Sequence, residues 1–401
     1  MQFFRRHEWG LLLVILLMIV LTTLLDSRHN YWNDPRQSAI NILRQTSFLG
    51  IIALGAAVVI ISGGIDLSSG SMIAFSGSVC AVLLVLLAPN EMRNSLPVGW
   101  GVISTAIAGT LLAGFLIGSL HAWLITVVGL PPFVATLATL VGLRSFARAL
   151  VDNVTTSVWR ASKSQIDVAD DTFRNFAKHL WIPATLFALL AVVTWIMLSR
   201  TVLGRHLYAL GGNEQAARLS GIRTEKLKWF AYVFSAMLSS LAGMLYVADT
   251  STANPQMLGQ GYELNAIAAA VVGGCSLQGG VGTIPGTVLG VLFLRIVIDG
   301  VAKIIKSGAD VYEGLIVGMV VVLAVAFAQL RGVARGGKRF FAGPLGVVAA
   351  VNLALIAGAA AALFSQKAKL AASQFGGVTA LAVFGLLIGV RWLEGRRERR
   401  S

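Results

Sequence analysis

The sequence has little charge. Only 12% of its 401 residues are Asp, Glu, Lys or Arg, about half the share found in soluble globular domains. Apolar residues make up 56%, and the mean hydropathy is +0.78. They form continuous runs of about 20 residues, the length that a helix needs to cross a bilayer, whereas membrane-barrel strands are short and alternate apolar with polar residues. The sequence therefore predicts an all-α, polytopic membrane protein.

Cysteine and catalytic motifs are also scarce. Cys80 and Cys275 both lie in apolar surroundings, so neither a disulfide framework nor a metal site is expected. No HExxH or GxxxxGK[ST] sequence is present. "AFSGS" around Ser76 loosely resembles a serine-nucleophile motif, but nothing in the sequence places His121 beside it. We predict a protein that is not an enzyme, with no catalytic residues, no metal and no directly bound cofactor.

Acidic residues are outnumbered by basic ones, and the formal net charge is +14. In membrane proteins, cytoplasmic loops collect Lys and Arg, so this excess predicts topology rather than a nucleic-acid partner. The basic segments 199–228 and 331–339 and the C-terminal tail should be cytoplasmic, and the charge-balanced segment 151–178 should lie outside. The apolar run 9–25 is long for a signal peptide and lacks a cleavage site. We interpret it as an uncleaved first helix, with both termini in the cytoplasm.

Charge and parity together predict the number of crossings. Residues 1–337 should form a core of ten helices, and residues 338–401 should add a two-helix hairpin and a basic tail. One core crossing, 262–274, is short and bounded by glycine, as is typical of a broken or half-length helix. The other predicted crossings are 9–25, 47–62, 68–88, 99–121, 131–150, 180–198, 229–248, 284–298 and 311–330, followed by 341–364 and 374–393.

Two glycine-rich segments interrupt the apolar runs. They are "GGIDLSSGS" at 63–71 and "VVGGCSLQGGVGTIPGTVLG" at 271–290. Irregular backbone at membrane depth is tolerated only where protein or a water-filled cavity surrounds it, so both should lie inside the protein. They look alike, but both Gly-Gly turns should face the same side, which does not fit an inverted repeat directly. Homology and chance similarity both remain open.

Asp66 lies within the first of these segments. A carboxylate at the centre of a membrane helix costs roughly 2.5–3.5 kcal/mol on insertion scales, so it seldom faces lipid. One interpretation is that Asp66 caps the following helix by accepting backbone N–H bonds, and this shaping role is favoured. The alternative is direct contact with a substrate.

Four motifs, in this order, carry a family resemblance. They are "ISGGIDLSSGSMIAFSG", "LPPFVATLATLVGLRSFA", "GRHLYALGGNEQAARLSGIRTEKLKWFAYVFSAMLSSLAGMLYVA" and "ELNAIAAAVVGGCSLQGGVGTIPGTVLGVLFL". From about residue 10 to 331 the chain closely resembles the permease subunit of bacterial ABC importers for monosaccharides, of the ribose/xylose/galactose type. The sequence departs from the family pattern at Ser69, at Ala138, where glycine is usual, and in the extension 338–401.

The resemblance implies a multi-pass protein of the bacterial inner membrane, in contact with membrane lipid. It implies a ten-helix permease that works as a homodimer or with a related chain. Two cytoplasmic ABC ATPase subunits would use the ATP, and an extracytoplasmic sugar-binding protein would deliver the sugar. A short cytoplasmic helix would dock into a groove on the ATPase.

Two sets of site residues follow. The residues expected at the substrate path or helix break are Gly63, Gly64, Asp66, Ser68, Phe133, Thr136, Asn265, Gly273 and Gly274. Thr139 is a further candidate beside Phe133 and Thr136, although helix packing through small polar residues explains these positions equally well. The residues expected to couple to the ATPase surround a helix near 213–220 with Asn213 as its N-cap; they are Gly204, Arg205, Gly211, Asn213, Ala216, Ala217, Arg218 and Gly221. An ordinary basic loop is the alternative there.

Other transport classes remain as alternatives. Permeases of the same superfamily for branched-chain amino acids or nucleosides resemble the later half of the chain, but the intact "GGIDLS" favours a sugar. An ion-coupled secondary transporter would be expected to carry more intramembrane carboxylates than Asp66. At the predicted outer end of the ninth segment, Asp299 and Lys303 are spaced i,i+4. They predict either a simple ion pair or a contact with the binding protein.

Overall fold

The structure is a computed structural model that describes residues 6–26, 29–305, 314, 317–318, 322, 343–367 and 372–398. The chain divides into two compact units, Met1–Ala324 and Val325–Ser401. The predicted boundary between residues 337 and 338 lies outside the described residues, as do the basic segment 331–339 and most of the predicted crossing 311–330.

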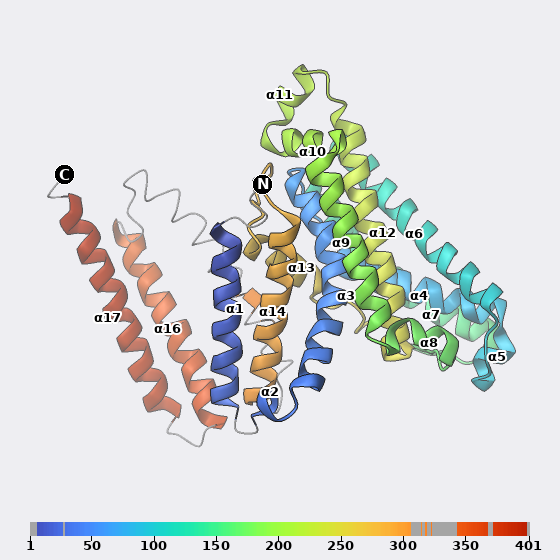
Figure 1. Ribbon diagram of the computed structural model, residues 1–401, viewed down its shortest axis with the longest axis horizontal. Helices are drawn as coiled ribbons and strands as arrows, with labels where there is room; N and C mark the ends of the chain where they lie inside the picture. The colour runs from blue at the N-terminus through green and yellow to red at the C-terminus, as the bar shows by residue number, and fades with distance from the viewer. Residues whose placement is uncertain are drawn as a thin grey trace. The chain divides into compact units, whose positions relative to one another are not determined.

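The described part of the first unit is built from helices and one short pair of strands (Figure 1). The helices are α1 (Arg6–Leu25), α2 (Asn30–Asn33), α3 (Pro35–Ile61), α4 (Ser69–Leu87), α5 (Pro89–Asn94), α6 (Trp100–Thr126), α7 (Pro132–Trp159), α8 (Asp171–Lys178), α9 (Trp181–Arg200), α10 (Val202–Gly212), α11 (Glu214–Leu219), α12 (Thr224–Thr250), α13 (Tyr262–Val272) and α14 (Ile284–Ile305). Strand β1 (Ile166–Asp167) pairs antiparallel with β2 (Thr252–Ala253).

Eight helices of the described chain are long and apolar enough to cross a membrane: α1, α3, α4, α6, α7, α9, α12 and α14. The all-α, polytopic prediction is therefore confirmed. Helix α13 spans only 11 residues, in agreement with the short crossing predicted at 262–274. Helix α3 begins at Pro35, well before the predicted residue 47, because its polar first turns give no hydropathy signal. Its start is set by Pro35 and by Asp34, whose carboxylate accepts the Gln37 N–H at 3.2 Å.

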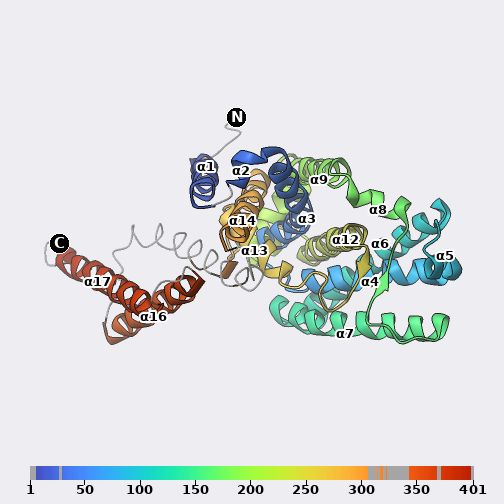
Figure 2. The same ribbon diagram turned by 90° about the horizontal axis from the view of Figure 1, so that it is seen from below.

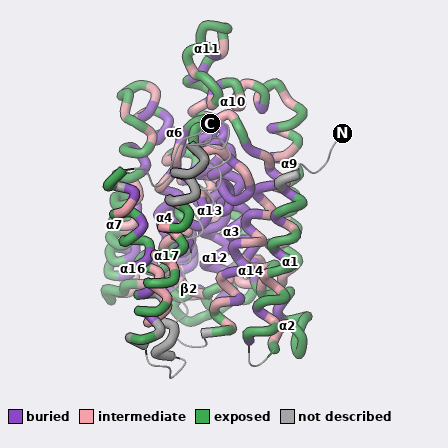
Figure 3. Tube along the Cα trace, turned by 90° about the vertical axis from the view of Figure 1, so that its left-hand side faces the viewer, coloured by how far each residue is buried: buried purple, intermediate pink, exposed green. Residues whose placement is uncertain are grey.

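Helices α3 and α12 form the centre of the first unit. In Figure 2, α12 lies between α3 on one side and α4 on the other, with α7 beyond α4, and the packed helix pairs agree with this order. Burial follows the same plan, because α3, α12 and α13 are largely buried whereas α1 and α9 are largely exposed (Figure 3). Exposed apolar surface on such outer helices suits contact with lipid.

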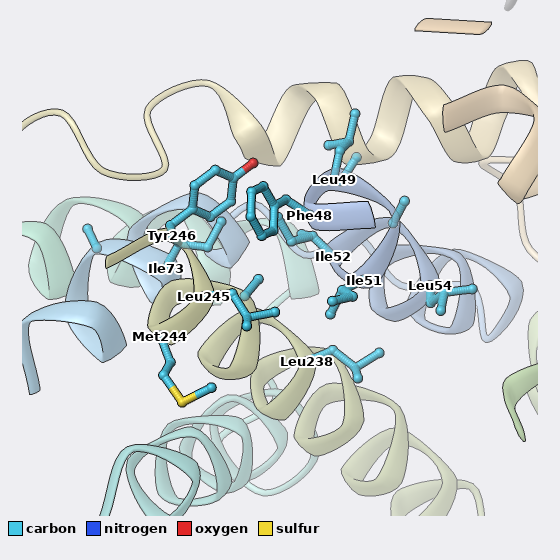
Figure 4. Packing of buried hydrophobic residues seen from close by; sticks show 14 of the residues in the cluster. Phe48, Leu49, Ile51, Ile52, Leu54, Ile73, Leu238, Met244, Leu245 and Tyr246 are labelled. Atoms are coloured by element: carbon cyan, nitrogen blue, oxygen red, sulfur yellow. The ribbon is translucent and has the colours of Figure 1, made fainter. Parts of the chain in front are cut away.

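The contact between α3 and α12 is apolar and closely packed (Figure 4). Phe48, Ile52 and Leu245 are fully buried, and the rings of Phe48 and Tyr246 lie 4.8 Å apart. Small residues allow the backbones to approach, since a Cβ on Gly55 would lie 2.8 Å from the Ser235 Cα. This pattern is typical of helix association within membranes, where close van der Waals packing drives contact.

Both predicted Gly-Gly turns end a helix in the same way. After α3, the Gly64 N–H donates to the Val59 carbonyl and Gly63 has a φ of +84°. After α13, the Cys275 N–H donates to the Ala270 carbonyl and Gly274 has a φ of +96°. This bonding pattern around a left-handed residue is the Schellman motif, which glycine adopts without a steric penalty. The similarity of the two segments therefore has a local structural reason that requires no common ancestry.

The second unit contains the predicted hairpin. Its helices are α16 (Gly343–Lys367) and α17 (Ala372–Glu398), close to the predicted 341–364 and 374–393. The helices approach through small residues: a Cβ on Gly358 would lie 2.7 Å from both the Ala380 Cβ and the Gly376 carbonyl oxygen. The Arg391 guanidinium donates to the Gly343 carbonyl at 3.0 Å, which joins the far ends of the pair.

Candidate transport site and coupling region

Asp66 lies in the non-helical segment between α3 and α4 and is 3% exposed. One carboxylate oxygen, Oδ1, accepts the Ser68 N–H at 2.9 Å and the Ser68 hydroxyl at 2.6 Å. The other, Oδ2, accepts the Ser235 hydroxyl of α12 at 2.8 Å. The carboxylate thus ties the break to the central helix, and both of its oxygens are occupied by protein donors.

The capping prediction needs a correction in detail. The N-cap position of α4 is Ser68, whose side chain makes no capping bond. Asp66 lies two residues earlier and accepts the N–H of Ser68 itself, which is the geometry of an Asx turn. The carboxylate therefore shapes the turn that leads into α4, and it does not satisfy the N–H groups of the first helical turn.

A band of buried polar groups surrounds this turn. The His121 Nε2 of α6 lies 2.7 Å from the Thr139 Oγ1 of α7. The Ser71 hydroxyl donates to the Ser68 carbonyl at 2.8 Å and lies 3.4 Å from the Thr139 carbonyl. The Thr136 hydroxyl reaches the Ile65 carbonyl at 3.3 Å. Helices α4 and α7 are thereby hydrogen-bonded to the break, and α6 is hydrogen-bonded to α7.

The Ser69 hydroxyl at the start of α4 and the His121 Nδ1 are buried without a hydrogen-bond partner within the described part of the chain. The Tyr232 hydroxyl of α12 is buried beside the Ile65 backbone. The rings of His121 and Tyr232 lie 6.3 Å apart, edge to face. A Cβ added at Gly64 would overlap the Tyr232 hydroxyl. The sequence does not indicate His121 or Tyr232 as site residues, because neither stands in a recognisable motif and only the packing of α6 against α12 brings them together.

The predicted path residues do not all lie together. Phe133 is half exposed, whereas Thr136, one turn further along α7, is fully buried. The two side chains therefore face different surroundings and do not form a joint surface. Asn265 is buried in α13, and Gly273 and Gly274 end that helix beside α14. A role for any of these residues in the path stays a prediction.

Glycine backbones join the helix breaks to α10. A Cβ on Gly211, at the end of α10, would overlap the Ile61 carbonyl oxygen and lie 2.5 Å from the Gly280 nitrogen. A Cβ on Gly279 would lie 2.8 Å from the Gly63 Cα. The Gly280 N–H donates to the Ile61 carbonyl at 2.9 Å. We call this contact of Gly63, Gly211, Gly279 and Gly280 the glycine junction.

The glycine junction unites residues that were predicted as separate sites. Gly63 was expected at the helix break and Gly211 in the coupling region, and their backbones now lie in contact. Through Gly279 and Gly280 the second glycine-rich segment meets the first, whereas the side of the membrane that both Gly-Gly turns face stays a prediction. Gly279 and Gly280 were missed, although "QGG" was visible in the second glycine-rich segment. No spacing in the sequence indicates which glycines meet in space.

Helices α10 and α11 project beyond the ends of α9 and α12 (Figure 1). Asn213 is the N-cap of α11, as predicted, and its Oδ1 accepts the Ala216 N–H at 3.0 Å. Ala216 is exposed but Ala217 is buried, so only Ala216 lies on the surface. Leu219, which the prediction did not include, is 90% exposed at the end of α11.

The remaining coupling candidates differ in their surroundings. Arg218 pairs with Glu225 at 2.7 Å and with Glu214 at 3.8 Å. Gly204 is buried where α10 approaches the last carbonyls of α9, Arg205 is exposed, and Gly221 has a φ of +81° in the turn before α12.

The opposite end of the unit carries a second polar group. The Lys303 ammonium lies 2.7 Å from the Asp299 carboxylate, which confirms the predicted i,i+4 ion pair. Asp299 also accepts the hydroxyl of Tyr31 at 2.7 Å. Burial, together with this hydrogen bond, raises the pKa of Tyr31 well above its ordinary value. The cluster attaches α2 to α14.

Comparison with known proteins places the chain in a family. A family model described as branched-chain amino acid transport system / permease component matches residues 38–325. The ribose import permease protein of Haemophilus influenzae is 37% identical over 257 residues, which cover 64% of this chain and 74% of that protein. The ribose import permease protein of Escherichia coli K12 is 35% identical over 316 residues, which cover 78% and 90%.

The galactose/methyl galactoside import permease protein of Haemophilus influenzae is 33% identical over 293 residues, covering 73% of this chain and 86% of that protein. No solved structure matches. The family match spans both glycine-rich segments, α10, α11 and, among the described spanning helices, all but α1 and the first three residues of α3. The chain is therefore a multi-pass membrane protein that belongs to the branched-chain amino acid transport system / permease component family.

Proposed function

We propose that this chain is the transmembrane subunit of an ATP-driven importer, and that it passes a monosaccharide from an extracytoplasmic binding protein into the cytoplasm. The observation that supports this most directly is the glycine junction. It connects a projecting helix pair to two helix breaks inside the membrane region by backbone contact. A transporter driven by a separate motor needs such a connection, because a movement at the surface must reach the substrate path.

The charge of the α10–α11 end supports its placement in the cytoplasm. Residues 199–228 carry six Lys or Arg residues and two Glu residues, and cytoplasmic loops are enriched in basic residues. Ala216 and Leu219 are exposed at its tip. We infer that they contact the ATPase subunit, which hydrolyses ATP outside this chain. The α2–α5–α8 end would then face the binding protein, with Asp299 and Lys303 near that surface.

The relatives favour a sugar over an amino acid. The family description names branched-chain amino acids, but the relatives at 33–37% identity are named for ribose and galactose. A second permease copy or a related chain would complete the path between two subunits.

Uptake in proteoliposomes tests the proposal. The permease would be reconstituted with its ATPase and a binding protein, and supplied in turn with D-ribose, D-xylose, D-galactose and L-leucine. We expect sugar uptake that requires ATP and persists with an uncoupler. Leucine uptake would support the branched-chain alternative, and uptake abolished by the uncoupler with ATP present would support an ion-coupled transporter.

A further inference from the structure

The two residues that lead into α14, Gly282 and Thr283, lie where both helix breaks meet. A Cβ on Gly282 would lie 2.6 Å from the Cys275 Sγ and 2.9 Å from the Ile61 Cγ1. Cys275 follows the turn that ends α13, and Ile61 is the last residue of α3. The backbone just before α14 is therefore in direct contact with the ends of two other helices.

Helix α10 holds this backbone by a hydrogen bond. The Tyr208 hydroxyl donates to the Gly282 carbonyl at 2.9 Å. Tyr208 precedes Gly211 by three residues, so both lie on the same face of α10 and the bond lies beside the glycine junction. Contacts between glycine backbones strongly resist closer approach, but only weak dispersion forces oppose their separation. A hydrogen bond opposes separation as well, because its two groups lose their partners when they move apart.

Helix α1 holds the next residue. The Thr283 hydroxyl donates to the Glu8 carboxylate at 2.8 Å and accepts the Gly286 N–H at 3.1 Å, so Thr283 also caps the first turn of α14. Glu8 is 3% exposed, and a hydrogen bond to a carboxylate is stronger than one between neutral groups. Further along the two helices, Ile15 of α1 and Ile296 of α14 belong to one buried apolar cluster. Helices α1 and α14 are therefore joined both at this bond and by packing.

We propose that Tyr208 is a positioning residue for transport. Together with Glu8, Gly282 and Thr283 it forms a connection, here called the α14 clamp, through which a shift of α10 moves the start of α14 and α1 with it. The proposal rests on the proposed function, because α10 shifts only if the ATPase drives it. The glycine junction transmits a push of α10, and the α14 clamp transmits the opposite movement. Helix α1 lies outside the family match, so the family likeness does not assign it this role.

Removal of single hydroxyl groups tests the α14 clamp in proteoliposomes that contain the permease, its ATPase and the binding protein. Tyr208→Phe keeps the aromatic ring and removes the donor. Thr283→Val removes the donor to Glu8 with little change in volume, whereas Thr283→Ser retains it. The matched control is Ser119→Ala, which removes the acceptor of the Trp229 indole N–H at 3.2 Å. That bond joins α6 to α12 and involves neither α10 nor α14.

The quantity measured is the amount of sugar imported per ATP hydrolysed, counting only the hydrolysis that the binding protein stimulates. The sugar is D-ribose, D-xylose or D-galactose, whichever the unmodified importer takes up. We expect Tyr208→Phe and Thr283→Val to lower this ratio roughly three- to tenfold, the factor that loss of one hydrogen bond typically produces. Thr283→Ser and Ser119→Ala should leave the ratio unchanged. The ATPase should co-purify with all four variants, because the tip of α11 is not altered.

An unchanged ratio in Tyr208→Phe would overturn the proposal. A lower melting temperature, with uptake and hydrolysis reduced in parallel, would overturn it too, because that pattern shows support of the fold alone. An equal fall of the ratio in Ser119→Ala would mean that any lost bond between helices has this effect, which also contradicts the α14 clamp. A normal ratio in Thr283→Val would exclude α1 from the connection and overturn it in the form proposed. Failure of the unmodified importer to take up any of the three sugars would instead refute the proposed function.

Discussion

At the scale of single residues, Asp66 shows how a charge is accommodated in an apolar chain. Its two carboxylate oxygens accept three hydrogen bonds from Ser68 and Ser235, and charge-assisted bonds of this kind are stronger than neutral ones. The band formed by His121, Thr139 and Tyr232 lies close by. The bonding explains why a carboxylate can remain at this position without touching a substrate.

Two substitutions of Asp66 distinguish the structural effect of its hydrogen bonds from the effect of its charge on transport. Asp66→Asn keeps an acceptor for the Ser68 N–H, and the Ser235 hydroxyl can rotate to accept from the new amide. We expect this variant to fold and to transport close to normally. Asp66→Leu leaves the Ser68 N–H and the Ser235 hydroxyl buried without the acceptor, at about 1–3 kcal/mol for each group, and should misfold or aggregate. Thermal unfolding in detergent and uptake measure the two effects.

A different pattern would contradict the shaping role. If Asp66→Asn folds with an unchanged melting temperature but loses uptake, then the charge itself acts in transport.

At the scale of helices and turns, the glycine junction is the feature with the strongest steric constraint. Gly63, Gly211, Gly279 and Gly280 place the end of α10 against both helix breaks with no side chain between them. Backbone segments in direct contact move together as a rigid body, because packed interfaces resist continuous deformation. Movement of α10 should therefore move both breaks.

Gly211→Ala tests this junction. Its Cβ would overlap the Ile61 carbonyl oxygen, and overpacking of this kind typically costs about 1–3 kcal/mol. We expect a lower melting temperature and reduced ATP-dependent uptake. The matched control is Gly212→Ala, because a Cβ at Gly212 meets nothing within 4 Å. Equal behaviour of the two variants would argue against a tight junction.

The tip of α11 gives a separate prediction about partner contact. Ala216→Trp and Leu219→Ser change exposed side chains, so folding and membrane insertion should persist. We expect loss of ATPase co-purification and roughly tenfold lower uptake, equivalent to about 1.4 kcal/mol of docking energy. Val202→Ser, exposed at the base of α10, is the control. Ala217→Trp is the poorer probe, because that residue is buried and its effect would include misfolding.

Normal co-purification and uptake in Ala216→Trp would exclude this tip as the docking element.

At the scale of the whole molecule, the family match ends at the residue where the second unit begins. The match ends at residue 325, and the second unit begins at Val325. Its helices, α16 and α17, pack on each other through Gly358, Gly376 and Ala380. Small-residue packing of this kind holds membrane helices together without polar groups. We predict an accessory hairpin that does not line the sugar path.

A stop codon after Lys338 tests this prediction. We expect uptake to remain largely intact, with lower expression, because the transport elements all precede the hairpin. Uptake should be normalised to the amount of inserted permease, and ATPase co-purification should be measured in parallel. Complete loss of uptake in a truncated protein that still inserts and still binds its ATPase would show that the hairpin takes part in transport.

The sequence by itself determined the membrane class, most helix positions and both helix breaks. These features depend on local properties: apolar runs long enough to span a bilayer, the left-handed conformation that Gly63 and Gly274 adopt, and the side-chain cap that Asn213 supplies. Each acts within a few residues, so each can be read from neighbouring positions. The start of α3 was misplaced because hydropathy does not register a polar first turn that Asp34 and Pro35 define.

Only the tertiary structure decided which of these features meet. Gly63 and Gly211 are far apart in the chain, and nothing local relates the backbone of one to that of the other. The same holds for the hydrogen bonds that the Arg144 guanidinium donates to the Pro255 and Leu258 carbonyls, for the one that the Ser235 hydroxyl donates to Asp66, and for the burial of Ala217 beside exposed Ala216. Such contacts depend on how whole helices pack, and packing is governed by shape complementarity summed over many residues.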